Sequence, residues 1–142
     1  MDLAALASEV IAAYLANLRL GRLLAVEYGF RPIFFWQPVI TTRKCKTPDE
    51  RRWADDYTND PERRRLLYEA IIDERRRHPA LAEASDIIDL SAIFDDWTEP
   101  VYIDLYHLSE AGNAAVAGAM LPAVAQIASA LRDSTRAAVE GI

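Results

Sequence analysis

A continuous run of large apolar residues between two prolines limits the folds that this chain can adopt. The run Ile33-Phe34-Phe35-Trp36 follows Pro32 and ends before Pro38. These residues favour β-structure and do not alternate with polar ones, which is typical of a strand buried on both faces of a parallel sheet. We therefore expect a parallel sheet with helices on its faces.

Segments with helical spacing lie on both sides of this strand. Residues 3–28 are rich in Ala and Leu and predict one long helix that Gly29 ends. Thr47 and Pro48 are suited to begin a second helix, and Asn59-Asp60-Pro61-Glu62 a third that runs to about Arg77. The inward face of the third helix is predicted to carry Leu66, Leu67, Ala70 and Ile71.

A second short strand is predicted at residues 86–90, Asp-Ile-Ile-Asp-Leu. Strands that alternate with helices indicate an α/β fold with a parallel sheet, and two strands are expected in this chain. At 142 residues the chain has the length of one ordinary domain, residues 1–142.

The segment that follows the second strand carries the clearest chemical signal. It includes Asp104-Leu-Tyr-His107, in which a carboxylate precedes a histidine by three residues. A histidine is a natural general base near neutral pH, and a carboxylate on its other ring nitrogen fixes the tautomer and stabilises the imidazolium. We therefore interpret His107 as a candidate base and Asp104 as the residue that orients it. A turn hydrogen bond without chemistry is the simpler alternative.

A long amphipathic helix is predicted directly after this pair. Ser109 is a suitable N-cap residue. Apolar residues then recur at intervals of three and four at Val116, Ala117, Met120, Leu121, Val124, Ile127, Ala128 and Leu131. The Asp-x-x-His pair thus lies on a loop between a strand and a helix, where α/β proteins place functional groups.

These residues resemble a known family. The block Val101–Met120 is similar to the last block of the SGNH (GDSL-like) hydrolases, in which Asp-x-x-His serves a catalytic serine. The segment from Gly29 to Pro38 resembles the family strand that ends in Gln-Pro, and Asp89–Phe94 resembles the segment before the last block. The resemblance implies a flavodoxin-like three-layer α/β/α fold, and it implies an ester or acyl hydrolase that needs no cofactor. Gln37 and the loop after it become candidates for contact with a small acyl ester of a carbohydrate or lipid.

The chain also departs from this family. A Gly-Asp-Ser block carries the family's nucleophile, and a later Gly and a Gly-x-Asn-Asp block supply oxyanion donors, all before the Gln-Pro strand. Here the residues before Ile33 are predicted to form a helix instead. The partial imitations Asn59-Asp60 and Asp133-Ser134 both follow that strand. We therefore expect this chain to correspond to the C-terminal half of such a domain, with the serine and oxyanion donors outside it. A strand edge left bare in this way could promote self-association.

Composition and charge argue against several other classes. The net charge of −6 argues against a nucleic-acid binder, and the Arg triplets 63–65 and 75–77 share their helix with acidic residues, as on a solvated face. No apolar run approaches the length of a membrane span, and Met1-Asp2 lacks the basic region of an export signal. If the chain is a fragment, that absence says nothing of the whole protein. The acidic residues Asp95, Asp96 and Glu99 lack a nearby His or Cys, so no metal site is predicted.

Two alternatives remain open at the level of sequence. The chain could be a truncated or degenerate copy that persists as a non-catalytic interaction module. It could also be a thiol enzyme that uses Cys45, the one cysteine, with His107. An inert, exposed Cys45 is the simpler interpretation.

Overall fold

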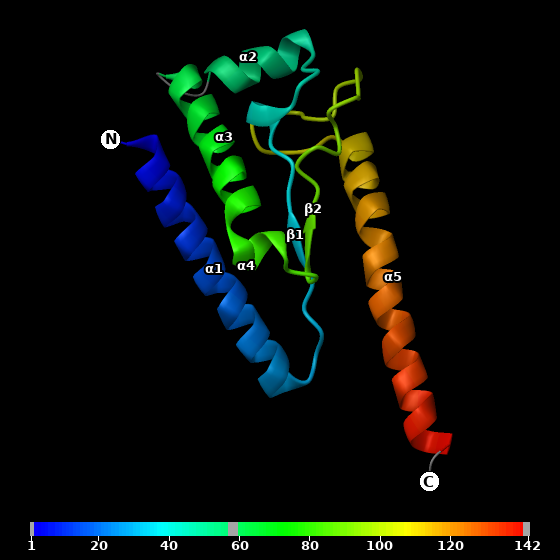
Figure 1. The fold of residues 1–142 in the computed structure, drawn as a ribbon. Helices are drawn as coiled ribbons and strands as arrows, with labels where there is room; N and C mark the ends of the chain where they lie inside the picture. The colour runs from blue at the N-terminus through cyan, green and yellow to red at the C-terminus, as the bar shows by residue number, and fades with distance from the viewer. Residues whose placement is uncertain (1, 57–59, 141–142) are drawn as a thin grey trace.

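The computed structural model describes the backbone of residues 2–56 and 60–140 (Figure 1). Helices and strands alternate along the chain, as the sequence predicts, and the coarse α/β class is confirmed. The elements in chain order are α1 (Leu3–Tyr28), β1 (Phe34–Trp36), the 3₁₀ turn η1 (Ile40–Thr42), α2 (Pro48–Asp56), α3 (Pro61–Arg77), α4 (Pro79–Ala82), β2 (Ile87–Asp89) and α5 (Glu110–Glu140).

The predicted helix ends are found where the sequence places them. Gly29 ends α1 with φ of 70°, a backbone conformation that glycine adopts without steric cost. The side chain of Asp60 accepts the N–H of Arg63 at 2.9 Å and begins α3. Asn59, which was predicted to share in this start, lies outside the described residues.

The two strands pair in parallel, with Phe34 opposite Ile87 and Trp36 opposite Asp89. Both are shorter than predicted, although Leu90 N–H still donates to Trp36 O at 2.9 Å. All three residues of β1 are half-buried, so the expectation of a strand buried on both faces is wrong. The reason is that, within the described residues, each strand has one neighbour only. One edge of each strand is therefore bare.

Helices α1 and α3 cover one face of the sheet and build the main core with it (Figure 1). The ring of Trp36 meets that of Tyr14 edge-on, with 4.8 Å between ring centroids. The buried core residues are Ala7, Ile11, Leu18, Ile71 and Leu81, and Tyr14, Phe34, Trp36, Leu67, Ala70 and Ile87 pack against them.

Two expectations for α3 need correction. Leu66 was predicted to face inward, but it is 41% exposed. The face of α3 that packs against the main core carries Leu67, Ala70 and Ile71 instead. Arg75 was predicted to lie on a solvated face, but its side chain is buried. It forms an ion pair with Asp89, and its guanidinium lies over the ring of Trp36.

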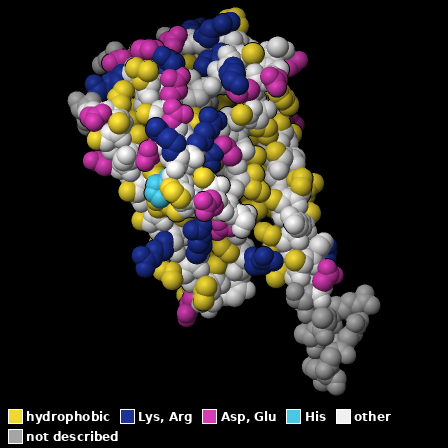
Figure 2. All heavy atoms as spheres, viewed as in Figure 1, with side chains coloured by type: hydrophobic (Ala, Val, Ile, Leu, Met, Phe, Trp, Pro, Cys, Tyr) yellow, Lys and Arg dark blue, Asp and Glu magenta, His cyan; other side chains and the backbone are white. Residues whose placement is uncertain are grey.

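Helix α5 lies on the other face of the sheet and is largely exposed (Figures 1 and 2). Ala115 and Val116, near its start, pack against a second small core. Farther along, Leu121 is 64% and Val124 46% exposed. The predicted helix is thus confirmed. Four residues of its predicted apolar face are half-buried and four are exposed, the latter being Ala117, Leu121, Val124 and Leu131.

Two helices have the length and composition of membrane-spanning segments, α1 and the part of α5 between Glu110 and Asp133. The expectation that no apolar segment approaches that length is wrong by these two criteria. Apolar helices in the core of a soluble protein meet the same criteria, so this finding is weak evidence for a membrane protein.

Candidate functional site

Asp104 and His107 form a hydrogen-bonded pair on the loop before α5. Asp104 Oδ2 lies 2.7 Å from His107 Nδ1. The other carboxylate oxygen accepts the backbone N–H groups of Tyr106 at 2.7 Å and His107 at 2.8 Å. The hydrogen bond from the His107 ring, followed by those two N–H groups, lowers the pKa of Asp104 to about 2. Asp104 is therefore ionised at neutral pH and suited to orient the imidazole.

Backbone hydrogen bonds close the loop that presents this pair. Ile103 N–H donates to His107 O at 3.0 Å, and Ser109 N–H donates to Val101 O at 2.8 Å. The start of α5 lies so close that a Cβ added to Gly112 would come within 2.5 Å of Val101 O. Gly112 thus allows the helix to approach the base of the loop.

The side chain of His107 points into open space from this closed loop. It is 71% exposed, whereas that of Asp104 is 35% exposed. Its Nε2 has no hydrogen-bond partner among the described residues. The pair therefore leaves a free ring nitrogen that a nucleophile or a substrate can reach.

No nucleophile accompanies His107 in the described part of the chain. Ser109 is the nearest hydroxyl in sequence, but its Oγ accepts the N–H of Gly112 at 3.1 Å and caps α5, as predicted. Cys45 is exposed, and no hydrogen bond joins it to His107 among the described residues. The side chain of Ser134 and residue Asn59 lie outside the part that the structure describes.

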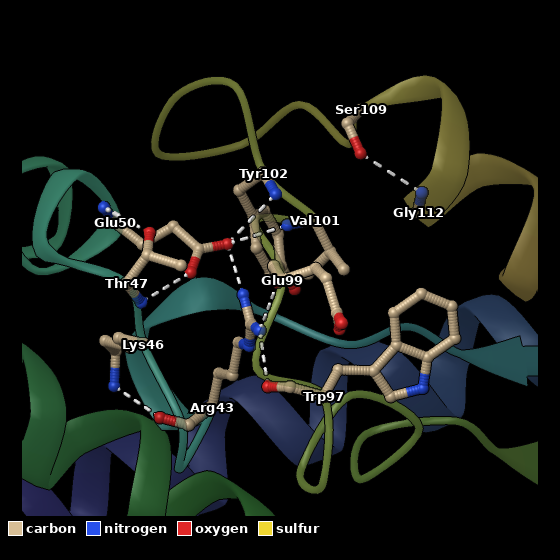
Figure 3. Close-up of polar contacts among 10 residues, drawn as sticks. All are labelled: Arg43, Lys46, Thr47, Glu50, Trp97, Glu99, Val101, Tyr102, Ser109 and Gly112. Atoms are coloured by element: carbon tan, nitrogen blue, oxygen red, sulfur yellow. Dashed lines mark hydrogen bonds and ion pairs between the residues drawn. The ribbon is translucent and has the colours of Figure 1, made fainter.

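A buried ion pair supports the loop from below (Figure 3). Arg43 and Glu50 pair with side chains that are 1% and 0% exposed. Glu50 Oε1 accepts the N–H of Val101 at 3.0 Å and of Tyr102 at 3.1 Å, while Oε2 accepts the N–H of Thr47 at 2.9 Å. The Glu50 side chain therefore provides hydrogen-bond acceptors for the backbone N–H groups of Val101 and Tyr102, where the loop begins.

Arg43 completes the connection on its other side (Figure 3). Its Nη2 donates to the carbonyl oxygens of Trp97 and Glu99, both at 2.8 Å. Burial alone would raise the pKa of Glu50, but the N–H groups of Thr47, Val101 and Tyr102 and the charge of Arg43 more than offset it, so the pKa is lowered. The pair is thus charged, and it fastens residues 97–102 to the segment after β1.

Sequence reasoning missed both members of this pair. One signal was available for Glu50, because Thr47-x-x-Glu50 has the spacing of a capping box, in which the Glu side chain turns back toward the helix start. Nothing in the local sequence marks Arg43 as buried, since its partners Trp97 and Glu99 lie far along the chain.

Gln37 and the Asp104–His107 loop border the same cavity, of about 320 Å³. Leu105, Tyr106 and Leu108 line it from the loop, on either side of His107 in sequence. Gln37 also lines a neighbouring apolar cleft of about 520 Å³ between α1, α3 and β1. The structure therefore places the predicted contact residue beside the loop, although no hydrogen bond joins Gln37 to the pair among the described side chains.

Of the acidic residues Asp95, Asp96 and Glu99, Asp95 forms an ion pair with the exposed Lys44 at 2.6 Å. Among the described residues, no group of three or more His, Cys, Asp or Glu side chains is arranged to hold a metal ion.

The fold and the loop together define an α/β protein that presents an oriented histidine. Comparison with protein-family models, with curated proteins and with solved structures finds no match.

Proposed function

We propose that this chain contributes the base half of an ester or acyl hydrolase site of the SGNH type. His107 is the general base, Asp104 orients it, and the serine nucleophile and oxyanion donors come from a segment outside the chain. The flavodoxin-like three-layer fold is part of the same proposal. The observation that carries it is the 2.7 Å contact between Asp104 Oδ2 and His107 Nδ1, with Nε2 left free.

The geometry suits that role for a physical reason. With Asp104 holding the proton on Nδ1, the lone pair of His107 lies on Nε2, where it can remove a proton from a hydroxyl. A serine Oγ within hydrogen-bond reach of Nε2 would then attack the acyl carbonyl. The proton would return through Nε2 to the alcohol that leaves, and water would release the acyl group by the same route.

The proposal predicts no hydrolysis by the isolated chain. Loss of one oxyanion donor alone typically costs on the order of a hundred- to a thousand-fold in rate, and here the nucleophile is missing too. Release of p-nitrophenol from short acyl esters should therefore not exceed that of His107→Ala. Turnover that depends on His107 but survives Cys45→Ala would reveal an overlooked nucleophile, and Ser109→Ala would then be tested first. Loss in Cys45→Ala would favour the thiol enzyme.

The positive test supplies the missing half. A segment with Gly-Asp-Ser and Gly-x-Asn-Asp blocks, sought in the reading frame upstream of Met1, would be fused to the chain. Hydrolysis should appear, and His107→Ala should cost nearly as much as loss of the serine, because such groups act as a unit. Asp104→Asn should cost about ten-thousand-fold, as the corresponding change does in a serine protease, by favouring the wrong tautomer.

The acidic residues near the loop provide matched controls. Asp95→Asn and Asp96→Asn remove the same charge without touching His107, and each should leave the rate within a few-fold of the parent. A fused protein in which Asp95 is essential and Asp104 dispensable would refute the assignment. A well-folded fusion without any activity would favour a non-catalytic interaction module.

A further inference from the structure

The cavity beside the Asp104–His107 loop has a composition that points to a particular ligand. It lies between the segment after β1, helix α3, the loop itself and the first turns of α5. Arg64 is the only charged side chain among the described residues that line it; the others are Gln37, Pro38, Val39, Thr41, Tyr68, Tyr102, Leu105, Tyr106, Leu108, Asn113 and Val116. The cavity therefore has a positive wall and no acidic one.

Arg64 differs from the arginines that are paired with carboxylates in the core and beside it on α3. Arg65, next to it, forms ion pairs with Glu62 and Glu69. Three further arginines each form an ion pair with one carboxylate: Arg22 with Asp86, Arg43 with Glu50 and Arg75 with Asp89. Arg64 has no carboxylate partner among the described residues, and the one hydrogen bond of its guanidinium goes from Nη2 to the carbonyl oxygen of Ala54.

The guanidinium of Arg64 is also incompletely satisfied. Its Nη1 makes no hydrogen bond with the described residues and is not among the buried unpartnered atoms, so solvent reaches it. Its Nε is buried without a partner, but so are the Nε atoms of Arg43 and Arg75. An anion in the cavity would supply the countercharge that the guanidinium lacks.

Other groups on the cavity wall can donate to the same anion. Gln37 carries an amide and Tyr68 a hydroxyl. Tyr102 also borders the cavity, but its hydroxyl is buried and has no hydrogen-bond partner among the described residues. A planar guanidinium with nearby neutral donors matches the oxygens of a carboxylate or a phosphate.

We propose that this cavity binds a carboxylate or phosphate group through Arg64, and that the Asp104–His107 site acts on esters that carry such an anionic group. That the bound molecule is an ester rests on the proposed function above. The binding of an anion by Arg64 does not depend on it.

The first experiment measures anion binding by the chain alone. The ¹⁵N-labelled protein is titrated with inorganic phosphate and, separately, with acetate, at constant ionic strength. Saturable shifts are expected at the amides of Tyr102, Tyr106 and Asn113. Arg64→Gln should weaken binding at least tenfold, since a hydrogen bond to a charged group contributes about 1.5–3 kcal/mol.

Arg19→Gln is the matched control. It removes the same charge from an exposed site on α1, a helix that contributes no residue to this cavity, and should leave binding unchanged. If Arg64→Gln disturbs the fold, Arg64→Lys keeps the charge but loses the planar fork, and a several-fold weakening is expected. Equal affinities in the Arg64 and Arg19 variants, or shifts that do not saturate, would overturn the proposal.

The second experiment uses the fused, complete domain. Monomethyl succinate and methyl butyrate, an acidic and a neutral ester of similar size, are compared by kcat/KM. Arg64→Gln should lower the preference for the acidic ester at least tenfold and leave the neutral ester within a few-fold. Equal losses on both esters would refute the substrate class. Anion binding without any hydrolysis would refute the proposed function while the anion site stands.

Discussion

Glu50 accepts the backbone N–H of Val101 at 3.0 Å, although the two residues lie 51 positions apart. This contact joins the first turn of α2 to the start of the loop that carries Asp104 and His107. Both ends of the contact are buried. The position of an exposed histidine thus depends on a carboxylate that solvent does not reach.

We predict that Glu50→Gln destabilises the protein by about 3–5 kcal/mol, the range for breaking a buried ion pair, because the charge of Arg43 loses its partner. Denaturation by urea, followed by circular dichroism, measures this difference. Glu69→Gln is the control, because it breaks an exposed pair with Arg65 and should cost much less stability. A loss in Glu50→Gln no larger than that in Glu69→Gln would contradict this prediction.

The same carboxylate should make stability depend on pH. The pKa of Glu50 is lower in the folded state than its ordinary value of 4.5. Its contribution is therefore complete above that value and is lost as the pH falls through the lower folded pKa. When the pH is lowered from neutral into this acid range, the free energy of unfolding should therefore fall less in Glu50→Gln than in the wild type. Parallel curves for the two proteins would contradict the assignment.

The hydrogen bond from His107 should control the pKa of Asp104. In the wild type this pKa is about 2, and in His107→Ala it should rise toward its ordinary value of 3.8. It should remain below that value, because the backbone N–H groups of residues 106 and 107 still donate. The carboxyl ¹³C shift of Asp104, followed by NMR against pH, gives both values. Tyr106→Ala keeps its backbone N–H and should leave the pKa unchanged.

Two glycines of α5 should respond oppositely to alanine. In Gly112→Ala the new Cβ would meet Val101 O, so we expect a loss of about 1–3 kcal/mol, typical of overpacking. In Gly118→Ala the Cβ meets nothing within 4 Å, and helix propensity should add about 0.5–1 kcal/mol of stability. Thermal denaturation of the two variants compares them directly. A neutral Gly112→Ala would mean that α5 does not hold the loop closely.

We expect the isolated chain to self-associate, because β1 has a bare edge in the described structure and unpaired strands recruit other chains. Sedimentation velocity over a range of concentrations tests this. The doubly substituted Leu121→Glu, Val124→Glu protein separates the causes, since both residues are exposed on α5. If it still associates, the strand edge is responsible; if it becomes monomeric, the apolar face of α5 is. A wild-type chain that remains a monomer throughout would refute the expectation.

The elements of this fold could be predicted largely from sequence because their signals are local. Gly29, Asp60 and Ser109 end or begin helices through contacts within a few residues. The Asp104–His107 contact was predictable for the same reason, since three residues on a turn bring the two side chains together. Leu66 and Arg75 were placed wrongly because their burial depends on α1, β1 and β2, which the periodicity of α3 does not encode.

The missed ion pair has the same explanation. Besides Glu50, Arg43 contacts the carbonyl groups of Trp97 and Glu99, which lie more than fifty residues along the chain. Its surroundings therefore form only when the chain folds. The cavity lined by Gln37 and Arg64 is likewise formed by segments that are distant in sequence.

The first turns of α5 pack against the second core through Ala115 and Val116, whereas farther along Leu121 and Val124 face solvent and Ile127 only borders a cavity beside the sheet. A helix anchored at one end can unwind from the other without disturbing α1, α3 or the sheet. Its middle amides should therefore exchange with deuterium far faster than those of α1, and a protease should trim it while the remaining body stays folded. The base of the loop at Gly112 would be the last part of this helix to open.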